Sequence, residues 1–510
     1  MTAIPQEYLL DYTSLKNSPS VLPESHAQGF KHISPEYMHK TNRYTALIQG
    51  QHFVQVPEYT LETNNQKLTN FPIAYKTWGK LSPKKDNCIV VCHALTGSSD
   101  IQDWWGPLVG RNKLKSFDYS RYFIICLNSC GSPYGSLSPV TNPILNENGE
   151  LIGDADFPLV TVRDDVAIHK LILEKVFGIP FINTCIGGSM GGMLALEYAS
   201  LYGEDFVKKL VVLATSARHS AWCISWSEAQ RQAIYSDPYF KNGRYDINEQ
   251  PAQGLAAARM TALLTYRSRN SFEQRFSRRE ASDAAKKKVL EQEENATRVT
   301  SRRMSSDIEF KTVDVSAGSS SSSSTTTLEN QNSNKREDKL FSAQSYLRYQ
   351  GLKFVNRFDA NCYVSITKKL DSHDISRPSY HNINKYEDYE QRYREDPDSI
   401  MEEVLKDFQM PTLIIGIESD GLFTFSEQQY LAKHIPYAEL KIVKSLEGHD
   451  AFLLEFVEVN SYIRNFMNKF NRDMEDFHYD PLLDEEISKG VEIMDIKESM
   501  SGEAGDVTDW

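Results

Sequence analysis

Residues 181–200 read FINTCIGGSMGGMLALEYAS. An apolar, β-branched run at 181–186 precedes a glycine-rich turn and then a segment with helical apolar periodicity. The turn holds Gly187-x-Ser189-x-Gly191, whose small residues let the chain close sharply and leave the serine hydroxyl exposed. Such a string also occurs by chance, and a glycine-rich turn can instead pack a helix on a sheet or bind phosphate. Its place between a strand and a helix favours a nucleophilic serine.

Apolar runs on both sides of this element predict the rest of a sheet. Two early segments alternate apolar and polar residues, which is typical of an antiparallel, half-exposed hairpin; they are residues 52–57 and 71–78. Other runs are apolar throughout, as in strands buried on both faces; they span 87–92, 122–127, 210–215 and 412–417, with a shorter one at 440–443. Because helical patterns alternate with these runs, we predict an α/β fold with a mostly parallel sheet covered on both faces.

The chain divides by composition. Residues 1–43 are polar with scattered prolines, and we expect a flexible N-terminal extension. Residues 44–215 and 411–470 carry the strand and helix patterns of one core. The intervening 216–410 is largely helical in pattern and too long for a loop of a compact domain, so we expect an inserted helical lid. Within it, about 280–339 is of low complexity and predicted to be disordered.

Charge and cysteine content narrow the possible partners. The net charge is −13, and the acidic tail 471–510, expected to be flexible, contributes −10, so the rest carries only −3. This balance does not suggest a nucleic-acid partner.

Seven scattered cysteines, an odd number, favour a reducing compartment. Without a second pair, the four-residue spacings Cys88/Cys92 and Cys126/Cys130 predict no metal site. We find neither a secretion signal nor a membrane-spanning run, and expect a cytoplasmic protein.

A serine nucleophile needs a base, and the base needs an orienting carboxylate. In α/β-hydrolase folds these residues follow one another in the order Ser, Asp or Glu, His. Of the three histidines after the lid, His449 directly precedes the last predicted helix, His434 lies within a short helix and His478 lies in the tail. We therefore predict His449 as the base. Asp420, after the strand at 412–417, is the preferred acid, with Glu418 as the alternative.

The oxyanion of an acyl-transfer intermediate needs backbone N–H donors. We predict the N–H of Met190, which follows the nucleophile, and that of Leu95, in the loop after the strand at 87–92. His93 comes too early in the chain to be the base, so we interpret it as a residue that shapes this loop.

Several blocks together resemble the homoserine O-acetyltransferase family in its fungal form. They are HALTG (93–97), GGSMGGM (187–193), ATSARHS (214–220), ARM and LTYRS (within 258–268), SYLRYQG (345–351), RFDANCY (357–363) and EGHDAFLLE (447–455). The resemblance covers about residues 45–470 and fails only in the low-complexity insert and at the two ends.

The resemblance implies an α/β-hydrolase fold with an acyltransferase activity. Acetyl-CoA would be a co-substrate, L-homoserine the acceptor in methionine synthesis, and no cofactor would be permanently bound; a homodimer through lid helices is also implied. The family's triad falls on Ser189, Asp420 and His449. Its carboxylate-binding arginine falls on Arg259, its tyrosine at the substrate amine on Tyr266, and its aspartate at the amino group on Asp450.

Without the resemblance, Arg259 and Asp450 would pass for a helix-surface cation and a helix cap. A guanidinium can grip the carboxylate of a zwitterionic amino acid at two points, and a carboxylate suits its ammonium. The alternatives are an esterase, a non-enzymatic scaffold, and a related acyltransferase. The last would use another donor, such as succinyl-CoA, or another acceptor, such as serine or a hydroxymethyl antibiotic precursor. An intact triad argues against the scaffold.

Overall fold

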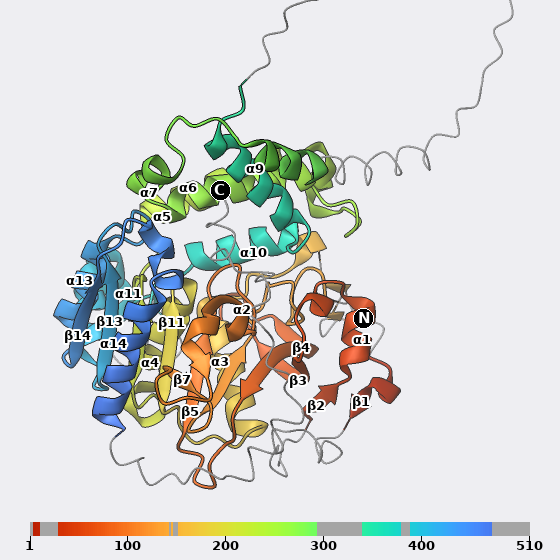
Figure 1. Ribbon diagram of the computed structural model, residues 1–510. Helices are drawn as coiled ribbons and strands as arrows, with labels where there is room; N and C mark the ends of the chain where they lie inside the picture. The colour runs from red at the N-terminus through yellow and green to blue at the C-terminus, as the bar shows by residue number, and fades with distance from the viewer. Residues whose placement is uncertain are drawn as a thin grey trace, which may run out of the picture.

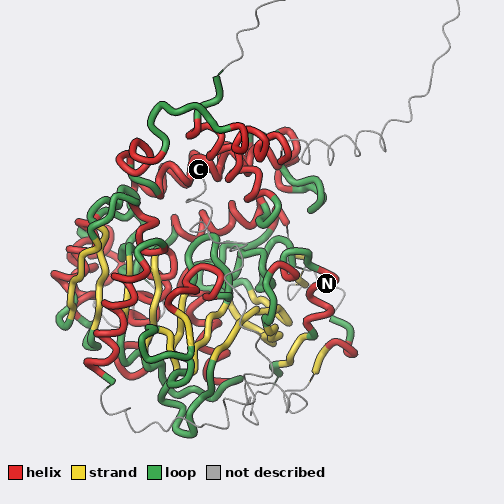
Figure 2. Tube along the Cα trace, in the orientation of Figure 1, coloured by secondary structure: helices red, strands yellow, loops and turns green. Residues whose placement is uncertain are grey.

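The computed structural model describes residues 4–10, 29–141, 144–145, 151–152, 154–292, 339–378 and 388–471. Within these ranges a ten-stranded sheet has the order β1-β2-β3-β4-β8-β5-β11-β12-β13-β14. Figures 1 and 2 show the sheet flanked by helices, with a separate group of helices above it. This arrangement confirms the predicted α/β fold with an inserted helical layer above one edge of the sheet.

Six strands form the parallel part of the sheet. They are β8 (Phe123–Leu127), β5 (Cys88–Cys92), β11 (Thr184–Gly188), β12 (Leu210–Leu213), β13 (Thr412–Ile417) and β14 (Ala438–Val443). Because both faces are covered, every residue of β5, β8, β11, β12 and β13 is buried. Parallel strands end at the same edge, so residues that follow β5, β11 and β13 meet there.

The antiparallel part begins with the expected hairpin of β3 (His52–Thr60) and β4 (Lys67–Trp78). Two short strands extend it, β1 (Leu9–Leu10) and β2 (Lys31–Ile33), and α1 (Pro35–Thr41) follows. The expectation of a flexible extension over 1–43 is therefore wrong for its described residues. Ile33 and Met38 are buried against Phe53 of β3, and this apolar contact holds the segment on the sheet.

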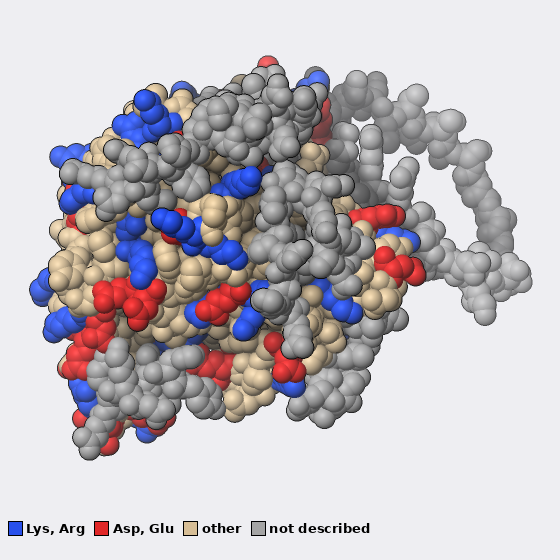
Figure 3. All heavy atoms as spheres, turned by 90° about the horizontal axis from the view of Figure 1, so that it is seen from below, with Lys and Arg blue, Asp and Glu red and all other residues tan. Residues whose placement is uncertain are grey.

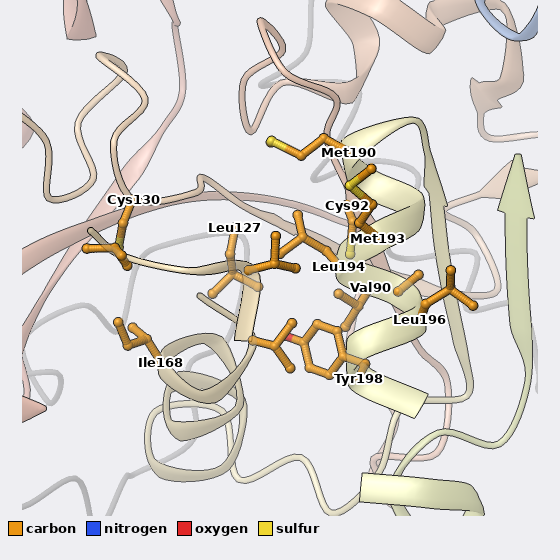
Figure 4. Packing of buried hydrophobic residues seen from close by; sticks show 14 of the residues in the cluster. Val90, Cys92, Leu127, Cys130, Ile168, Met190, Met193, Leu194, Leu196 and Tyr198 are labelled. Carbon is orange, nitrogen blue, oxygen red and sulfur yellow. The ribbon is translucent and has the colours of Figure 1, made fainter. Parts of the chain in front are cut away.

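Helices cover both faces of the sheet. One apolar cluster includes side chains of α3 (Val162–Lys175), α4 (Met190–Phe206) and α13 (Phe425–His434), whereas another includes side chains of α2 (Ile101–Trp105) and α14 (Phe456–Phe470). In Figure 4, Leu194 and Tyr198 of α4 lie among Val90 of β5 and Leu127 of β8. Two pairs of two-residue strands lie outside the main sheet: β6 (Val109–Gly110) with β7 (Phe117–Asp118), and β9 (Ile144–Leu145) with β10 (Leu151–Ile152).

The segment between β12 and β13 is mainly helical where it is described. Its helices are α5 (Ala221–Tyr235), α6 (Ala252–Tyr266), α7 (Arg269–Arg275), α9 (Ser342–Val355), α10 (Ala360–Asp371), α11 (Tyr389–Glu395) and α12 (Pro397–Lys406). In Figure 1, α5, α6, α7, α9 and α10 lie above the sheet as one layer, which we call the lid.

The low-complexity insert, predicted to be disordered over about 280–339, is described only at its two ends. Glu280 pairs with Phe341 in an antiparallel bridge, and the N–H of Ala281 donates to the carbonyl of Leu340 at 2.8 Å. Residues 283–292 are helical, so the prediction of disorder is wrong for this part. Residues 293–338 lie outside the described residues, as does almost all of the acidic tail.

A buried ion pair fastens the lid to the core. Lys369 of α10 pairs with Asp165 of α3, and both side chains are almost completely buried. The backbone of Cys130 completes the site: its N–H donates to Asp165 at 2.9 Å, and its carbonyl accepts from Lys369 at 2.8 Å. Four groups on three segments are thus held by one cluster of charge-assisted hydrogen bonds.

Replacing Lys369 with methionine should destabilise the protein by about 3–5 kcal/mol, because Asp165 would keep a buried charge without its partner. Chemical denaturation of the full chain measures the free energy of unfolding. Lys368→Met is the matched control, since Lys368 is exposed on the same helix. Equal unfolding free energies for the two variants would contradict a structural role for this pair.

Candidate active site

Ser189 occupies a sharp turn between β11 and α4. Its backbone has φ 58° and ψ −126°, a conformation that non-glycine residues rarely adopt. The flanking glycines are required by contact: a Cβ on Gly187 would lie 2.0 Å from the carbonyl oxygen of Gly191, and one on Gly191 would lie 2.1 Å from that of Cys92. The predicted turn therefore forms because its neighbours have no side chains, and it holds the serine in a strained position at the sheet edge.

Ser189, His449 and Asp420 come together at this edge. His449 Nε2 lies 2.9 Å from Ser189 Oγ, and His449 Nδ1 lies 2.7 Å from Asp420 Oδ2. The other carboxylate oxygen, Asp420 Oδ1, accepts the N–H groups of Leu422 and Phe423 at 2.9 and 3.0 Å. All three members are buried, whereas the alternative acid, Glu418, is exposed. This is the geometry of a nucleophile, a base and an orienting acid.

The position of His449 depends on a short turn that the sequence pattern did not indicate. We predicted that the last helix follows His449 directly, but a 3₁₀ turn (η7, Gly448–Leu453) comes first and α14 begins only at Phe456. Gly448 has φ 70° and contacts the backbone of Tyr266 and Ser268 so closely that a Cβ would lie 2.7 Å or less from it. The tight turn carries His449 towards the serine.

The electrostatic surroundings of His449 favour its protonated form. Burial alone would lower the pKa of the imidazole, but the hydrogen-bonded Asp420 carboxylate outweighs it, and Asp450 and Glu427 add to the effect, so the pKa is raised above its ordinary 6.5. Burial also raises the pKa of Glu427 to about 7.

This shift predicts the acid limb of the pH profile. A base must be neutral to act, so kcat/KM for the acyl donor should fall as the pH decreases through a midpoint above 6.5. Glu427→Gln removes a carboxylate that favours protonated His449 when it is ionised, and we expect the midpoint to move to lower pH. Glu390→Gln, an exposed change on α11, is the control. A wild-type midpoint below 6.5 would contradict the assignment.

The predicted oxyanion donors lie beside the serine in the fold. Met190 is the first residue of α4, where a backbone N–H has no acceptor within the helix. Leu95 is in the loop after β5. This loop lies against the serine turn: a Cβ on Gly191 would come within 3.1 Å of the His93 carbonyl oxygen. Both residues therefore lie close to the turn that carries Ser189, and their role as oxyanion donors stays a prediction.

His93 holds that loop rather than taking part in a proton relay. Its Nε2 accepts the N–H of Ser129 at 2.9 Å, so Nδ1 carries the proton and donates to the Ala94 carbonyl at 2.8 Å. Burial lowers the pKa of His93 to about 4, which keeps it neutral. This matches the interpretation of His93 as a loop-shaping residue.

The lid places Arg259 and Tyr266 of α6 next to the triad. The Arg259 side chain is 1% exposed, and its guanidinium carbon lies 4.8 Å from the ring centre of Phe354 and 5.7 Å from that of Tyr266. Burial and the neighbouring Arg357 charge lower the pKa of Arg259. The Tyr266 ring centre lies 6.0 Å from that of His449. Arg259 is thus a buried residue and no helix-surface cation.

Asp450 is buried beside His449 and pairs with a residue that sequence reasoning missed. Arg267 Nε lies 3.0 Å from Asp450 Oδ2, and Arg267 also pairs with Glu447. Glu447 in turn lies 2.8 Å from Arg275 of α7. Arg267 directly follows Tyr266 in the LTYRS block, and this position next to a candidate substrate residue is the sequence signal that could have identified it. This chain of charges joins the lid to the loop that carries the base.

Other candidates from the sequence lie elsewhere. His434 is buried on α13, 3.7 Å from Glu402, and does not reach the triad, while His478 lies outside the described residues. All seven cysteines are free and buried. Among the described residues no cluster of potential metal ligands was found, and no helix has the length and apolar character to cross a membrane.

Comparison with known proteins places this site in a family. A sequence model of the alpha/beta hydrolase fold matches residues 87–456. The homoserine O-acetyltransferase of Saccharomyces cerevisiae is 48% identical over 501 residues, covering 93% of this chain and 97% of its own. The chain belongs to the homoserine O-acetyltransferase family. The family member from Emericella nidulans is also 48% identical, over 457 residues, with 85% of this chain and 89% of its own covered.

Solved structures share the fold of this family member at lower identity. A homoserine O-acetyltransferase from Bacillus anthracis superposes with a TM-score of 0.60 at 19% identity, covering 82% of this chain and 97% of its own. The L374D mutant of esterase E22 gives the same TM-score at 20% identity, with 82% of this chain and 99% of its own covered. At such identities the likeness shows the α/β-hydrolase fold alone, which confirms the predicted fold.

Proposed function

We propose that this chain transfers acetyl from acetyl-CoA to the hydroxyl of L-homoserine, an early step toward methionine. The observation that carries the proposal is the hydrogen-bonded chain from Ser189 through His449 to Asp420, with the buried charges of Arg259 and Asp450 beside it. A hydrolase that uses water has no need of such charges, whereas a zwitterionic acceptor does.

In the first half of the cycle, His449 takes the proton of Ser189, and the serine oxygen attacks the carbonyl carbon of the thioester. The N–H groups of Met190 and Leu95 stabilise the oxyanion. The C–S bond then breaks, CoA leaves with the proton from His449, and Ser189 keeps the acetyl group. Acetyl-CoA is a substrate here, and no permanently bound cofactor takes part.

In the second half, homoserine replaces CoA. His449 removes the proton of its hydroxyl, and that oxygen attacks the acetyl ester of Ser189. The bond between the acetyl carbon and Ser189 Oγ then breaks, His449 returns the proton to Ser189, and O-acetyl-L-homoserine leaves. Arg259 would bind the carboxylate of homoserine, and Tyr266 and Asp450 its ammonium group. Because Asp450 already contacts Arg267, the ammonium would share this carboxylate with the arginine. The lid would exclude water during this step.

Crossing two donors with two acceptors tests the proposal. CoA release is followed with acetyl-CoA or succinyl-CoA, each combined with L-homoserine, L-serine or no acceptor. We expect fast release only with acetyl-CoA and homoserine. Preference for succinyl-CoA or serine would indicate a related acyltransferase, and release independent of any acceptor would indicate an esterase; either result would overturn the proposal.

We also propose a cytoplasmic homodimer joined through lid helices. Free thiols at all seven cysteines fit a reducing compartment. On the lid, Trp222 of α5 and Leu264 of α6 are 55% and 52% exposed, and apolar side chains of this kind favour a subunit contact. Sedimentation of the full chain should give the dimer mass, and Trp222→Glu with Leu264→Glu should give the monomer.

A further inference from the structure

A basic groove lies at the end of α14 far from the lid. It has a volume of about 680 Å³ and is bounded on one side by the last turns of α14 and on the other by the loops before β7 and β8. Its charged lining residues are all cations, namely Lys113, Arg121, Arg464 and Lys469. Figure 3 views the molecule from below, the end at which α14 terminates, and shows lysine and arginine side chains there interspersed with acidic ones.

These cations are poorly neutralised within the fold. Lys469 lies 3.4 Å from Glu439, and the Arg121 guanidinium lies over the ring of Tyr122 at 5.6 Å. In the ranges that the structure describes, no carboxylate pairs with Lys113, Arg121 or Arg464. Four like charges around one hollow repel one another, and an anionic occupant would relieve this repulsion.

The chain itself supplies an anionic segment at this place. Asn471, the last described residue, lines the groove and is 3% exposed, and its side-chain amide donates to Tyr122 Oη at 3.0 Å. The contact fixes the point at which the acidic tail leaves the fold. Residues 473–486 alone include seven carboxylates, the first of them Asp473, two positions beyond Asn471. An extended chain advances about 3.3 Å per residue, so this segment is long enough for its carboxylates to reach the cations of the groove.

We propose that the acidic segment 473–486 docks in the basic groove at the end of α14, within the same chain. Charge complementarity supplies the attraction, and the tether at Asn471 keeps the segment at high effective concentration. The groove lies on α14, which begins at Phe456 just after the η7 turn that holds His449, so docking would secure the far end of that helix.

Cleavage of the tail by a glutamate-specific protease tests this docking in the full chain. Charge reversal in the groove, Lys113→Glu with Arg464→Glu, should make cleavage at Glu485 and Glu486 roughly tenfold faster at low salt, since the groove would then repel the acidic tail instead of attracting it. The control reverses two exposed lysines on other elements, Lys40→Glu with Lys433→Glu, and should cleave like the wild type.

Salt and activity complete the test. At about 1 M salt, where the Debye length is about 3 Å, the wild-type tail should be cleaved as fast as that of the groove variant. The rate of CoA release should be unchanged in the groove variant, which shows that the fold is intact. Equal cleavage of wild type and groove variant at low salt would overturn the proposal, as would a wild-type cleavage rate that salt does not change.

Discussion

Ser189→Ala should abolish acetyl transfer, with a loss of about 10⁴- to 10⁶-fold in kcat, because the variant lacks the hydroxyl that lies 2.9 Å from the base. The variant should also fail to form an acetyl-enzyme, which mass spectrometry of the protein mixed with acetyl-CoA alone detects. The two measurements together separate loss of the nucleophile from loss of acceptor binding.

Ser225→Ala is the matched control for this change. Ser225 is an exposed serine on α5 whose hydroxyl donates to the Ala221 carbonyl of its own helix, and its removal should leave turnover unchanged. Unfolding midpoints of both variants should stay close to that of the wild type. Retained turnover in Ser189→Ala would rule out the covalent mechanism.

The second large effect is expected for Arg259→Lys, and it should fall on one half-reaction only. A lysine keeps the charge but cannot form two parallel hydrogen bonds to a carboxylate. The disruption of a buried, hydrogen-bonded charge pair costs about 2–5 kcal/mol, so kcat/KM for homoserine should fall about 10²- to 10³-fold. Formation of the acetyl-enzyme should be almost unchanged, because acetyl-CoA does not need this residue.

Rapid mixing with acetyl-CoA alone measures the first half-reaction, and the homoserine dependence of turnover measures the second. Arg244→Lys, an exposed arginine that pairs with Asp156, is the control. An equal loss in both half-reactions would contradict acceptor binding by Arg259 and would indicate that it supports the fold of the lid.

The parallel core and the geometry of the triad follow from local signals in the sequence. Each buried strand is a short run of apolar residues, and chain order together with the place of each residue after a strand favoured His449 and Asp420, with Glu418 left as the alternative acid. The structure explains why Glu418 is not the acid of the triad. The Glu418 side chain is exposed, whereas Asp420 is buried and accepts two backbone N–H groups. The two positions differ in burial, which a linear pattern does not carry.

The misjudged parts are those that tertiary contacts determine. β2 has three residues and α1 seven, too few for a periodic signal, and their order depends on burial of Ile33 and Met38 against β3. Likewise, nothing in the sequence pairs Arg267 with Asp450, since the two lie far apart along the chain. Charge pairs of this kind depend on how the lid packs on the core.

The bridge between Glu280 and Phe341 has a consequence for the evolution and engineering of the chain. Because the insert leaves and re-enters the lid at adjacent positions, its length can change without moving α7 or α9 on either side. Lengthening a closed loop adds only about 0.6 kcal/mol per doubling. This position can therefore accept sequence drift, an affinity tag or a whole reporter domain, while the helices that carry Arg259 and the acceptor site keep their places.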